Sequence, residues 1–300
     1  MARPVLCRSL MSTTTSRSIS WQRALPLVPQ EQSSMDGTIY FLHIPKSGGI
    51  SATRYFEEAA PSEAVCPHKL WDELVSSGPD PRWRVYHGHF GGLLPVWLRA
   101  WPTTVSLLRD PTSRTFSHIK HVVRTPSHPF HEMAQGMSVA QYCAHPILSR
   151  SVENYQARYL SSLALSRELV AQESSAYAAV QLAFENSMYG QDSAADLLET
   201  SCKAVEALAA VGVTEKHQTS LRLFSKVTGL PEPKAGFLAN VAPAGQQTSL
   251  NLTADDYAAV QSVTEIDRKL YERGLERFAR QCLEHGVAEI LPDIQGSRTS

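Results

Sequence analysis

Paired cysteines are missing from this chain. Its five cysteines lie far apart, and no two of them form a CxxC pair. An odd and scattered set of this kind is not typical of a zinc site or of a disulfide scaffold, so a reducing compartment is expected. The cysteines are Cys7, Cys66, Cys143, Cys202 and Cys282.

The sequence also lacks an excess of charge and a long apolar run. Its 28 Lys and Arg residues nearly balance its 29 Asp and Glu residues. The chain as a whole therefore has no electrostatic attraction to nucleic acid, and any binding of anions must be local. No stretch approaches the roughly 18 to 20 apolar residues that cross a bilayer. We expect no nucleic-acid partner and no transmembrane segment, and the sequence does not indicate an oligomeric state.

Acidic residues are absent before Glu31, in a stretch rich in Ser and Thr. Four arginines lie in this stretch: Arg3, Arg8, Arg17 and Arg23. Its composition predicts that residues 1–36 are a disordered N-terminal extension or an organellar transit peptide, and both alternatives stay open. We expect a cytoplasmic protein, with an organelle as the alternative location.

After this stretch, β-prone and helical segments alternate. Short apolar or β-branched runs predict four strands, at residues 38–43, 83–87, 104–108 and 208–213. Helical patterns occupy most of the remaining sequence, at residues 50–60, 111–124, 152–163, 166–188, 193–208, 216–228 and 254–280. This order predicts an α/β fold, in which a parallel sheet is flanked by helices and the C-terminal half is rich in helix.

We expect a single folded domain at residues 37–285 and a flexible C-terminal tail at 286–300. The His- and Pro-containing stretch at residues 125–147 is expected to form a loop or short helices that lie over the functional site.

The run PKSGGIS joins the first predicted strand to the first predicted helix. A helix N-terminus directs backbone N–H groups and a partial positive charge at one place, where anions bind. Lys46 adds a mobile charge there, and Gly48 and Gly49 let the backbone approach a phosphate. Ser47 and Ser51 can each donate a hydroxyl hydrogen bond. Because Lys46 precedes the glycines, the run differs from a Walker P-loop, and ATP hydrolysis is disfavoured. An ordinary strand-to-helix turn is the alternative.

Arg109 stands at the carboxyl end of the third predicted strand, at the edge where open α/β sheets bind ligands. Asp110 is a good N-cap for the helix that follows, and Arg114 and Ser117 lie on that helix. A guanidinium and a hydroxyl that converge from a strand end and a helix can hold a second phosphate. Two anion sites on neighbouring strands indicate a nucleotide phosphorylated at two positions. A simple ion pair of Arg109 is the alternative.

Three stretches in this order carry a resemblance to a known family: FLHIPKSGGIS at residues 41–51, HGH at 87–89 and LRDPTSRTFS at 108–117. In them the chain resembles the sulfotransferases that use 3′-phosphoadenosine 5′-phosphosulfate (PAPS), in the branch of heparan sulfate 2-O-sulfotransferase-like proteins. Weaker similarity at residues 154–160, 211–215 and 267–271 extends the resemblance over residues 37–280.

The resemblance implies a P-loop-like parallel sheet and one bound PAPS molecule, whose 3′-phosphate and 5′-phosphosulfate are held by two different sets of residues. Arg109 and Ser117 would hold the 3′-phosphate. Ile50 stands where the family usually has threonine, a departure that removes one hydroxyl contact worth about 1 kcal/mol. The residues implied for the 5′-phosphosulfate are Lys46, Ser47, Gly48, Gly49, Ile50 and Ser51.

Catalysis is expected to depend on a base and on a cation. A histidine of the HxH pair serves as base in the matched family, which indicates His89, with His87 as a second participant on the same side of the chain. Lys46 is expected to stabilise the leaving phosphate. The predicted reaction transfers a sulfuryl group from PAPS to a hydroxyl of a glycan or of a hydroxylated metabolite.

Two other classes of protein are weighed against this one. They are a catalytically silent relative that binds PAPS or another nucleotide, and a nucleotide-dependent kinase-like enzyme, which would lack the Walker lysine. No metal is predicted, since no carboxylate or cysteine completes a zinc set with the histidines that follow the second motif. Those histidines are His118, His121, His128 and His131.

Overall fold

A computed structural model of the chain describes residues 37–170, 174–189, 193–234 and 252–288. The predicted N-terminal extension at 1–36 and residues 289–300 of the predicted tail lie outside the described residues. The folded chain continues at least to Val287, which is buried in one of the cores.

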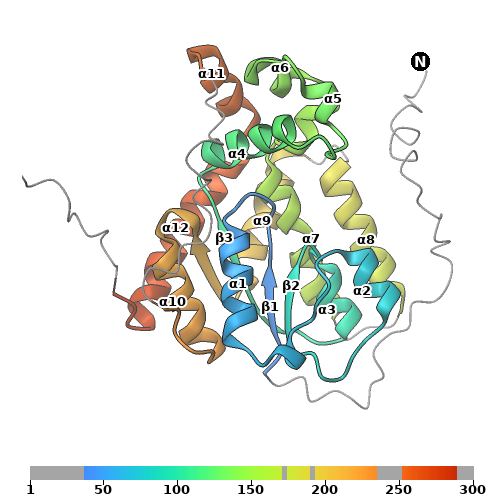
Figure 1. Cartoon of the computed structure of the whole chain (residues 1–300), viewed down its shortest axis with the longest axis vertical. Coiled ribbons are helices and arrows are strands. Elements are labelled where there is room, and N and C mark those ends of the chain that lie inside the picture. Colours follow the sequence, from blue (N-terminus) through green and yellow to red (C-terminus); the bar gives the residue numbers. More distant parts are fainter. Residues whose placement is uncertain (1–36, 171–173, 190–192, 235–251, 289–300) are drawn as a thin grey trace, which may run out of the picture.

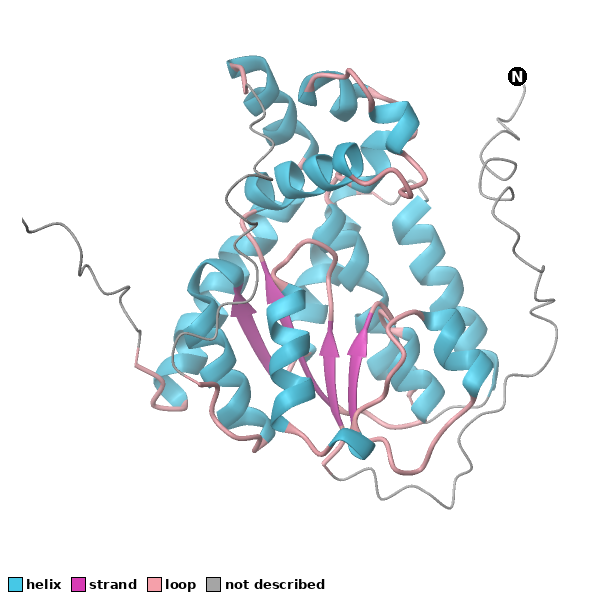
Figure 2. Ribbon diagram, viewed as in Figure 1, coloured by secondary structure: helices cyan, strands magenta, loops and turns pink. Residues whose placement is uncertain are grey.

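Four short parallel strands form the sheet (Figure 2). They are β1 (Ile39–Leu42), β2 (Val85–Gly88), β3 (Thr103–Leu108) and β4 (Ala210–Val213), in the spatial order β2-β1-β3-β4. All four predicted strands are confirmed, with ends that differ by no more than two residues. Since the strands are parallel, their carboxyl ends meet at one edge of the sheet.

Helices cover both faces of the sheet, so the fold is α/β as predicted (Figure 1). Strand side chains alternate between two cores: Tyr40 faces one, and Phe41 faces the other. The Phe41 face is covered by α1 (Gly49–Ala59) and α10 (His217–Thr228). The helices on the other face are α2 (Trp71–Ser77), α3 (Leu93–Leu98), α7 (Tyr155–Leu169), α8 (Ser174–Tyr189) and α9 (Ala194–Ala207).

A separate group of helices lies beyond the carboxyl ends of the strands, at the top of Figure 1. These helices pack around an apolar cluster of their own. They are α4 (Pro111–Arg124), α5 (His131–Ala134), α6 (Val139–Ala144) and α11 (Ala254–Val263). The prediction of short helices at 125–147 is therefore confirmed, and the group covers the edge where the two sequence motifs end.

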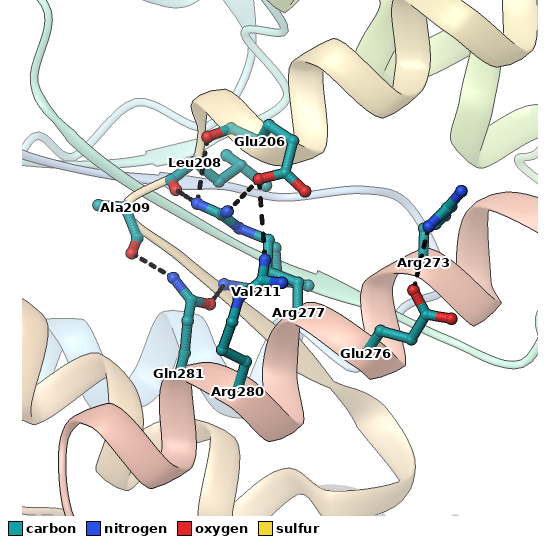
Figure 3. A network of polar contacts seen from close by, with 9 residues as sticks. All are labelled: Glu206, Leu208, Ala209, Val211, Arg273, Glu276, Arg277, Arg280 and Gln281. Carbon is teal, nitrogen blue, oxygen red and sulfur yellow. Dashed lines mark hydrogen bonds and ion pairs between the residues drawn. The ribbon is translucent and has the colours of Figure 1, made fainter.

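Side chains of α12 (Glu265–Glu284) cover the edge strand β4 (Figure 3). The amide of Gln281 accepts a hydrogen bond from the N–H of Val211 (3.0 Å) and donates one to the carbonyl of Ala209 (2.8 Å). Arg277 donates to the carbonyl of Leu208 (2.7 Å) and pairs with the carboxylate of Glu206. These side chains satisfy backbone groups that a further strand would otherwise pair, and so they close this edge of the sheet.

The starts of α7 and α12 cap each other. The side-chain oxygen of Asn154 accepts hydrogen bonds from the N–H groups of Ile266 (2.8 Å) and Asp267 (3.2 Å). In return, the carboxylate of Asp267 accepts from the N–H groups of Gln156 (3.1 Å) and Ala157 (2.8 Å). The helix predicted at 254–280 is therefore two helices, because the chain turns after Val263 to bring the start of α12 onto Asn154.

Two short helices were not predicted. One is α2, and the other is α3, in which all six residues are buried. A helix buried on every side has no alternation of polar and apolar residues, which is the signal that sequence patterns report. The helix expected from residue 152 starts instead at Tyr155, because Asn154 has a left-handed backbone (φ 42°).

Replacement of Asn154 tests the mutual capping. We expect Asn154→Gly to lower the free energy of unfolding by about 1 kcal/mol through loss of the cap. Asn154→Ala should lower it by about 1 kcal/mol more, since alanine tolerates the left-handed backbone poorly. Urea denaturation measures both values, and equal stabilities for the alanine and glycine variants would contradict the assigned backbone strain.

Candidate functional site

The loop between β1 and α1 contains two residues with left-handed backbones. Lys46 (φ 69°) and Gly48 (φ 75°) both have left-handed backbones, and the N–H of Ser47 donates to the carbonyl of Ile44 (3.2 Å). Alternation of left- and right-handed residues turns successive N–H groups toward one concavity, and such concavities bind anions. Helix α1 begins directly after Gly48, and its N-terminus adds partial positive charge there.

The two glycines of the loop are required for different reasons. A β-carbon on Gly48 would combine the left-handed backbone with a contact of 2.9 Å to Cγ2 of Thr214. A β-carbon on Gly49 would lie 1.8 Å from Nε2 of His43. The sequence predicted that Gly49 leaves room for a phosphate, whereas the room beside this residue is filled by an imidazole.

Lys46 lies within a local cluster of positive charge. A guanidinium nitrogen of Arg109, Nη1, donates to the carbonyl of Lys46 (3.1 Å), so the two predicted anion sites are in direct contact. Burial, and then three neighbouring guanidinium groups, lower the pKa of Lys46 to about 8. The three belong to Arg124, Arg109 and Arg114. This cluster is the local concentration of positive charge that a chain of balanced overall charge needs in order to bind an anion.

Gln156 holds the two motifs together from α7. Its side-chain oxygen accepts from the N–H of Arg109 (3.0 Å) and from the hydroxyl of Ser47 (3.3 Å), and its amide donates to the carbonyl of Arg109 (2.8 Å). The hydroxyl of Ser47 is therefore directed at the protein rather than at a ligand. Sequence reasoning missed Gln156, although the residue lies within the weaker similarity at 154–160.

Arg114, on α4, donates a hydrogen bond to the loop between β1 and α1. Its side chain is fully buried, and it donates to the carbonyls of Pro45 (3.2 Å) and Ser151 (2.8 Å) while its guanidinium lies 3.9 Å from the ring centre of Tyr155. Burial lowers its pKa to about 10. Arg114 is therefore a structural residue. Ser117, the predicted anion-binding residue of α4, is half-buried one turn along the same helix.

The other members of the predicted anion set differ in exposure. The side chain of Ile50 is 57% exposed, although it is large and apolar. Ser51 is buried within the first turn of α1. Of the side chains in this set, those of Ile50 and Lys46 therefore reach the surface, whereas the hydroxyls of Ser47 and Ser51 are buried.

His89 is held in one tautomer by the chain after β1. Its Nδ1 lies 2.8 Å from the carbonyl oxygen of His43, and a carbonyl can only accept, so Nδ1 carries the proton. The lone pair of Nε2 is then left to take a proton. Burial lowers the pKa of His89, while the bond to His43 raises it. This is the arrangement that a general base requires.

The surroundings of His87 differ from those of His89. The side chain of His87 is only 1% exposed, and its Nε2 faces a carboxylate oxygen of Glu57 on α1 at 3.6 Å. Burial lowers its pKa to about 4. The imidazole of His87 is therefore enclosed beside α1, and its part as a second catalytic histidine stays a prediction.

Two further predictions concern metals and membranes. Within the described ranges, no group of three or more His, Cys, Asp or Glu side chains is placed to hold a metal ion. Over the same ranges, no helix combines the length and the apolar character needed to cross a bilayer.

Comparison with models of protein families and with curated proteins gives no match for this chain.

The pKa of Lys46 makes anion binding dependent on pH. Inorganic sulfate keeps a constant charge between pH 7 and pH 9, so only the protein titrates. We expect the affinity for sulfate to fall as the pH rises through about 8, because Lys46 loses its positive charge. Chemical-shift titration measures this affinity. In Lys46→Met the binding should be weaker at pH 7 and less dependent on pH, and an unchanged profile in this variant would contradict the assignment.

Proposed function

We propose that this protein is a sulfotransferase that uses PAPS as its co-substrate. The observation that carries the proposal is the contact between Arg109 and the carbonyl of Lys46 (3.1 Å), at the ends of the neighbouring strands β3 and β1. A nucleotide with phosphates at its 3′ and 5′ positions has the reach to occupy both places at once. ATP carries no 3′-phosphate for the second of them.

The arrangement of β1, the loop and α1 is P-loop-like in our proposal. The loop lies at the carboxyl edge of a parallel sheet and ends at a helix N-terminus, where nucleotides bind in open α/β folds. Lys46 precedes Gly48 and Gly49, whereas a Walker lysine follows the last glycine of its loop. This order favours a phosphosulfate over a triphosphate as the ligand.

Each end of the nucleotide has its own set of residues. The loop from Lys46 to Ser51 holds the 5′-phosphosulfate, chiefly through backbone N–H groups and the Lys46 ammonium, since the hydroxyl of Ser47 is bonded to Gln156. Arg109 and Ser117 hold the 3′-phosphate. An anion bound there partly offsets the repulsion among the guanidinium groups around Lys46.

In the proposed transfer, His89 is the base and Lys46 stabilises the leaving phosphate. Nε2 of His89 takes the proton from the acceptor hydroxyl as its oxygen forms a bond to sulfur. The bond between sulfur and the bridging phosphate oxygen breaks, and its electron pair leaves with the phosphate. Lys46 stabilises the charge that develops on that oxygen. The products are the sulfated acceptor and 3′-phosphoadenosine 5′-phosphate (PAP).

The acceptor in this proposal is a hydroxyl-bearing glycan or small metabolite. Nucleic acid is disfavoured, because the 28 Lys and Arg residues of the chain are balanced by 29 Asp and Glu residues. The place of action is the cytoplasm, or an organelle if residues 1–36 act as a transit peptide.

Binding of PAP and AMP tests the nucleotide assignment, because the two ligands differ only in the 3′-phosphate. We expect calorimetry to show PAP bound about 10- to 100-fold more tightly than AMP, as for one or two charge-assisted hydrogen bonds. Arg109→Gln and Ser117→Ala should each reduce this ratio. Ser117→Ala is the cleaner variant, because Arg109 also holds the Lys46 carbonyl. Equal affinities for PAP and AMP in the natural chain would overturn the proposal.

Replacement of His89 tests the base. With labelled PAPS and a panel consisting of a phenol, a sterol and a desulfated heparan oligosaccharide, the natural chain should label at least one acceptor. His89→Ala should lower kcat by a factor of about 10² to 10⁴ and leave the affinity for PAP nearly unchanged. Unchanged turnover would remove His89 from the mechanism. Tight binding of PAP without transfer to any tested acceptor would favour the catalytically silent relative.

A further inference from the structure

The ring of His43 lies directly against the ring of His89. Their centroids are 4.4 Å apart, and the ring planes are inclined by 34°. The backbone carbonyl of His43 accepts the hydrogen bond from Nδ1 of His89 (2.8 Å). His43 therefore contacts the proposed base twice, through its ring and through its main chain.

The same ring also contacts the stretch from Lys46 to Ser51 that is proposed to bind the 5′-phosphosulfate, called the anion loop below. The three atoms nearest to a β-carbon built on Gly49 all belong to the ring of His43, at 1.8, 2.0 and 2.5 Å. The ring is also stacked on Phe41, with centroids 5.6 Å apart and planes inclined by 21°. Phe41 belongs to β1 and is completely buried, so the ring of His43 rests on a fixed support.

Charged and titratable groups surround His43. They are His89, His87, Lys46 and Lys69. Burial, followed by these groups, lowers the pKa of His43 to about 3. The ring is therefore neutral at every pH at which the protein is expected to work. A neutral ring adds no positive charge beside His89, and a ring with so low a pKa is a weak base. What His43 contributes to the site is its contacts with His89, Gly49 and Phe41.

We propose that His43 is a positioning residue, whose ring sets the place of His89 relative to the anion loop. The part of this inference that concerns catalysis rests on the proposed function, and the part that concerns the geometry of His89 does not. The ring fills the space between Gly49, where the 5′-phosphosulfate is proposed to bind, and the base that must face its sulfur. Glycine is then needed at position 49 because the ring of His43 occupies the space that a β-carbon would take.

The first measurement uses the imidazole NMR signals of the full chain and is independent of any enzymatic activity. The signals of His89 are assigned by their loss in His89→Ala. In the natural chain we expect the Nδ1–H tautomer and a lowered pKa. In His43→Ala the pKa of His89 should rise toward its ordinary value, because water reaches the ring. His43→Phe should keep it low, since a planar ring still covers His89. His285→Ala, at the exposed end of α12, is the control that leaves the signals of His89 unchanged.

The second measurement is a double-mutant cycle with Gly49. We expect Gly49→Ala to displace the ring of His43 and to lower the affinity for PAP and the rate of transfer. In the His43→Ala background the added methyl group meets no ring, so His43→Ala with Gly49→Ala should be no worse than His43→Ala alone. Additive losses in the double variant would overturn the proposed contact.

The third measurement is turnover. His43→Ala should lower kcat by about 10- to 100-fold, the cost of misplacing a reacting group, and His43→Phe should recover most of the loss. The affinity of His43→Ala for PAP and its melting temperature should stay close to those of the natural chain, which separates misplacement of His89 from loss of the fold. If the signals of His89 are the same in His43→Ala as in the natural chain, the inference is wrong even when sulfuryl transfer occurs. If PAP does not bind but the signals of His89 change as expected, the proposed function fails and the positioning role stands.

Discussion

The candidate site depends on a single hydroxyl that joins the ends of three parallel strands. Thr214 follows β4, and its Oγ1 lies within hydrogen-bonding distance of the carbonyl of Ser47 (2.9 Å), in the loop after β1, and of the carbonyl of Leu108 (3.1 Å), at the end of β3. Gln156 adds a second bridge from α7, between Ser47 and Arg109. The anion loop therefore has its shape before any ligand arrives, and little ordering entropy remains to be lost on binding.

This preformed shape stores strain and charge. A lysine with a left-handed backbone costs about 1–2 kcal/mol, and such strain persists only where the surroundings impose it. At Lys46, the surroundings include the hydrogen bond that its carbonyl accepts from Arg109. Three guanidinium groups around an ammonium add electrostatic repulsion, which lowers the pKa of Lys46 to about 8 after the larger effect of burial. An anion in the loop relieves this repulsion, and so the strained and charged region of the molecule is also its candidate binding site.

The frame around the site is stabilised far from it. Mutual capping by Asn154 and Asp267 fixes the starts of α7 and α12, and Gln156 is the second residue of α7. At the other end of α12, Gln281 and Arg277 hold the start of β4 (Figure 3). Since Thr214 directly follows β4, the capping and the edge contacts together set the positions of both bridges to the anion loop.

The sequence by itself determined the elements whose signals are local. Four apolar runs predicted the strands, and Asp110 with Pro111 predicted the start of α4, because β-propensity and capping act over a few neighbouring residues. It also brought forward Lys46 and Arg109, since the carboxyl ends of parallel strands must meet at one edge of a sheet, whereas His89 came from the resemblance to a family.

Only the tertiary structure decided what each of the remaining residues does. His87 and His89 look equivalent in the sequence, yet one is enclosed beside Glu57 and the other is covered by the ring of His43. Gln156 was missed because its partner, Arg109, lies on a distant segment of the chain. The reason for Gly49 was misjudged because the ring of His43 packs against this residue only in the folded chain. The propensities of neighbouring residues do not predict such partners. Burial and hydrogen bonding between distant segments arise only when the chain packs, and they decide which polar side chains support the site and which face a ligand.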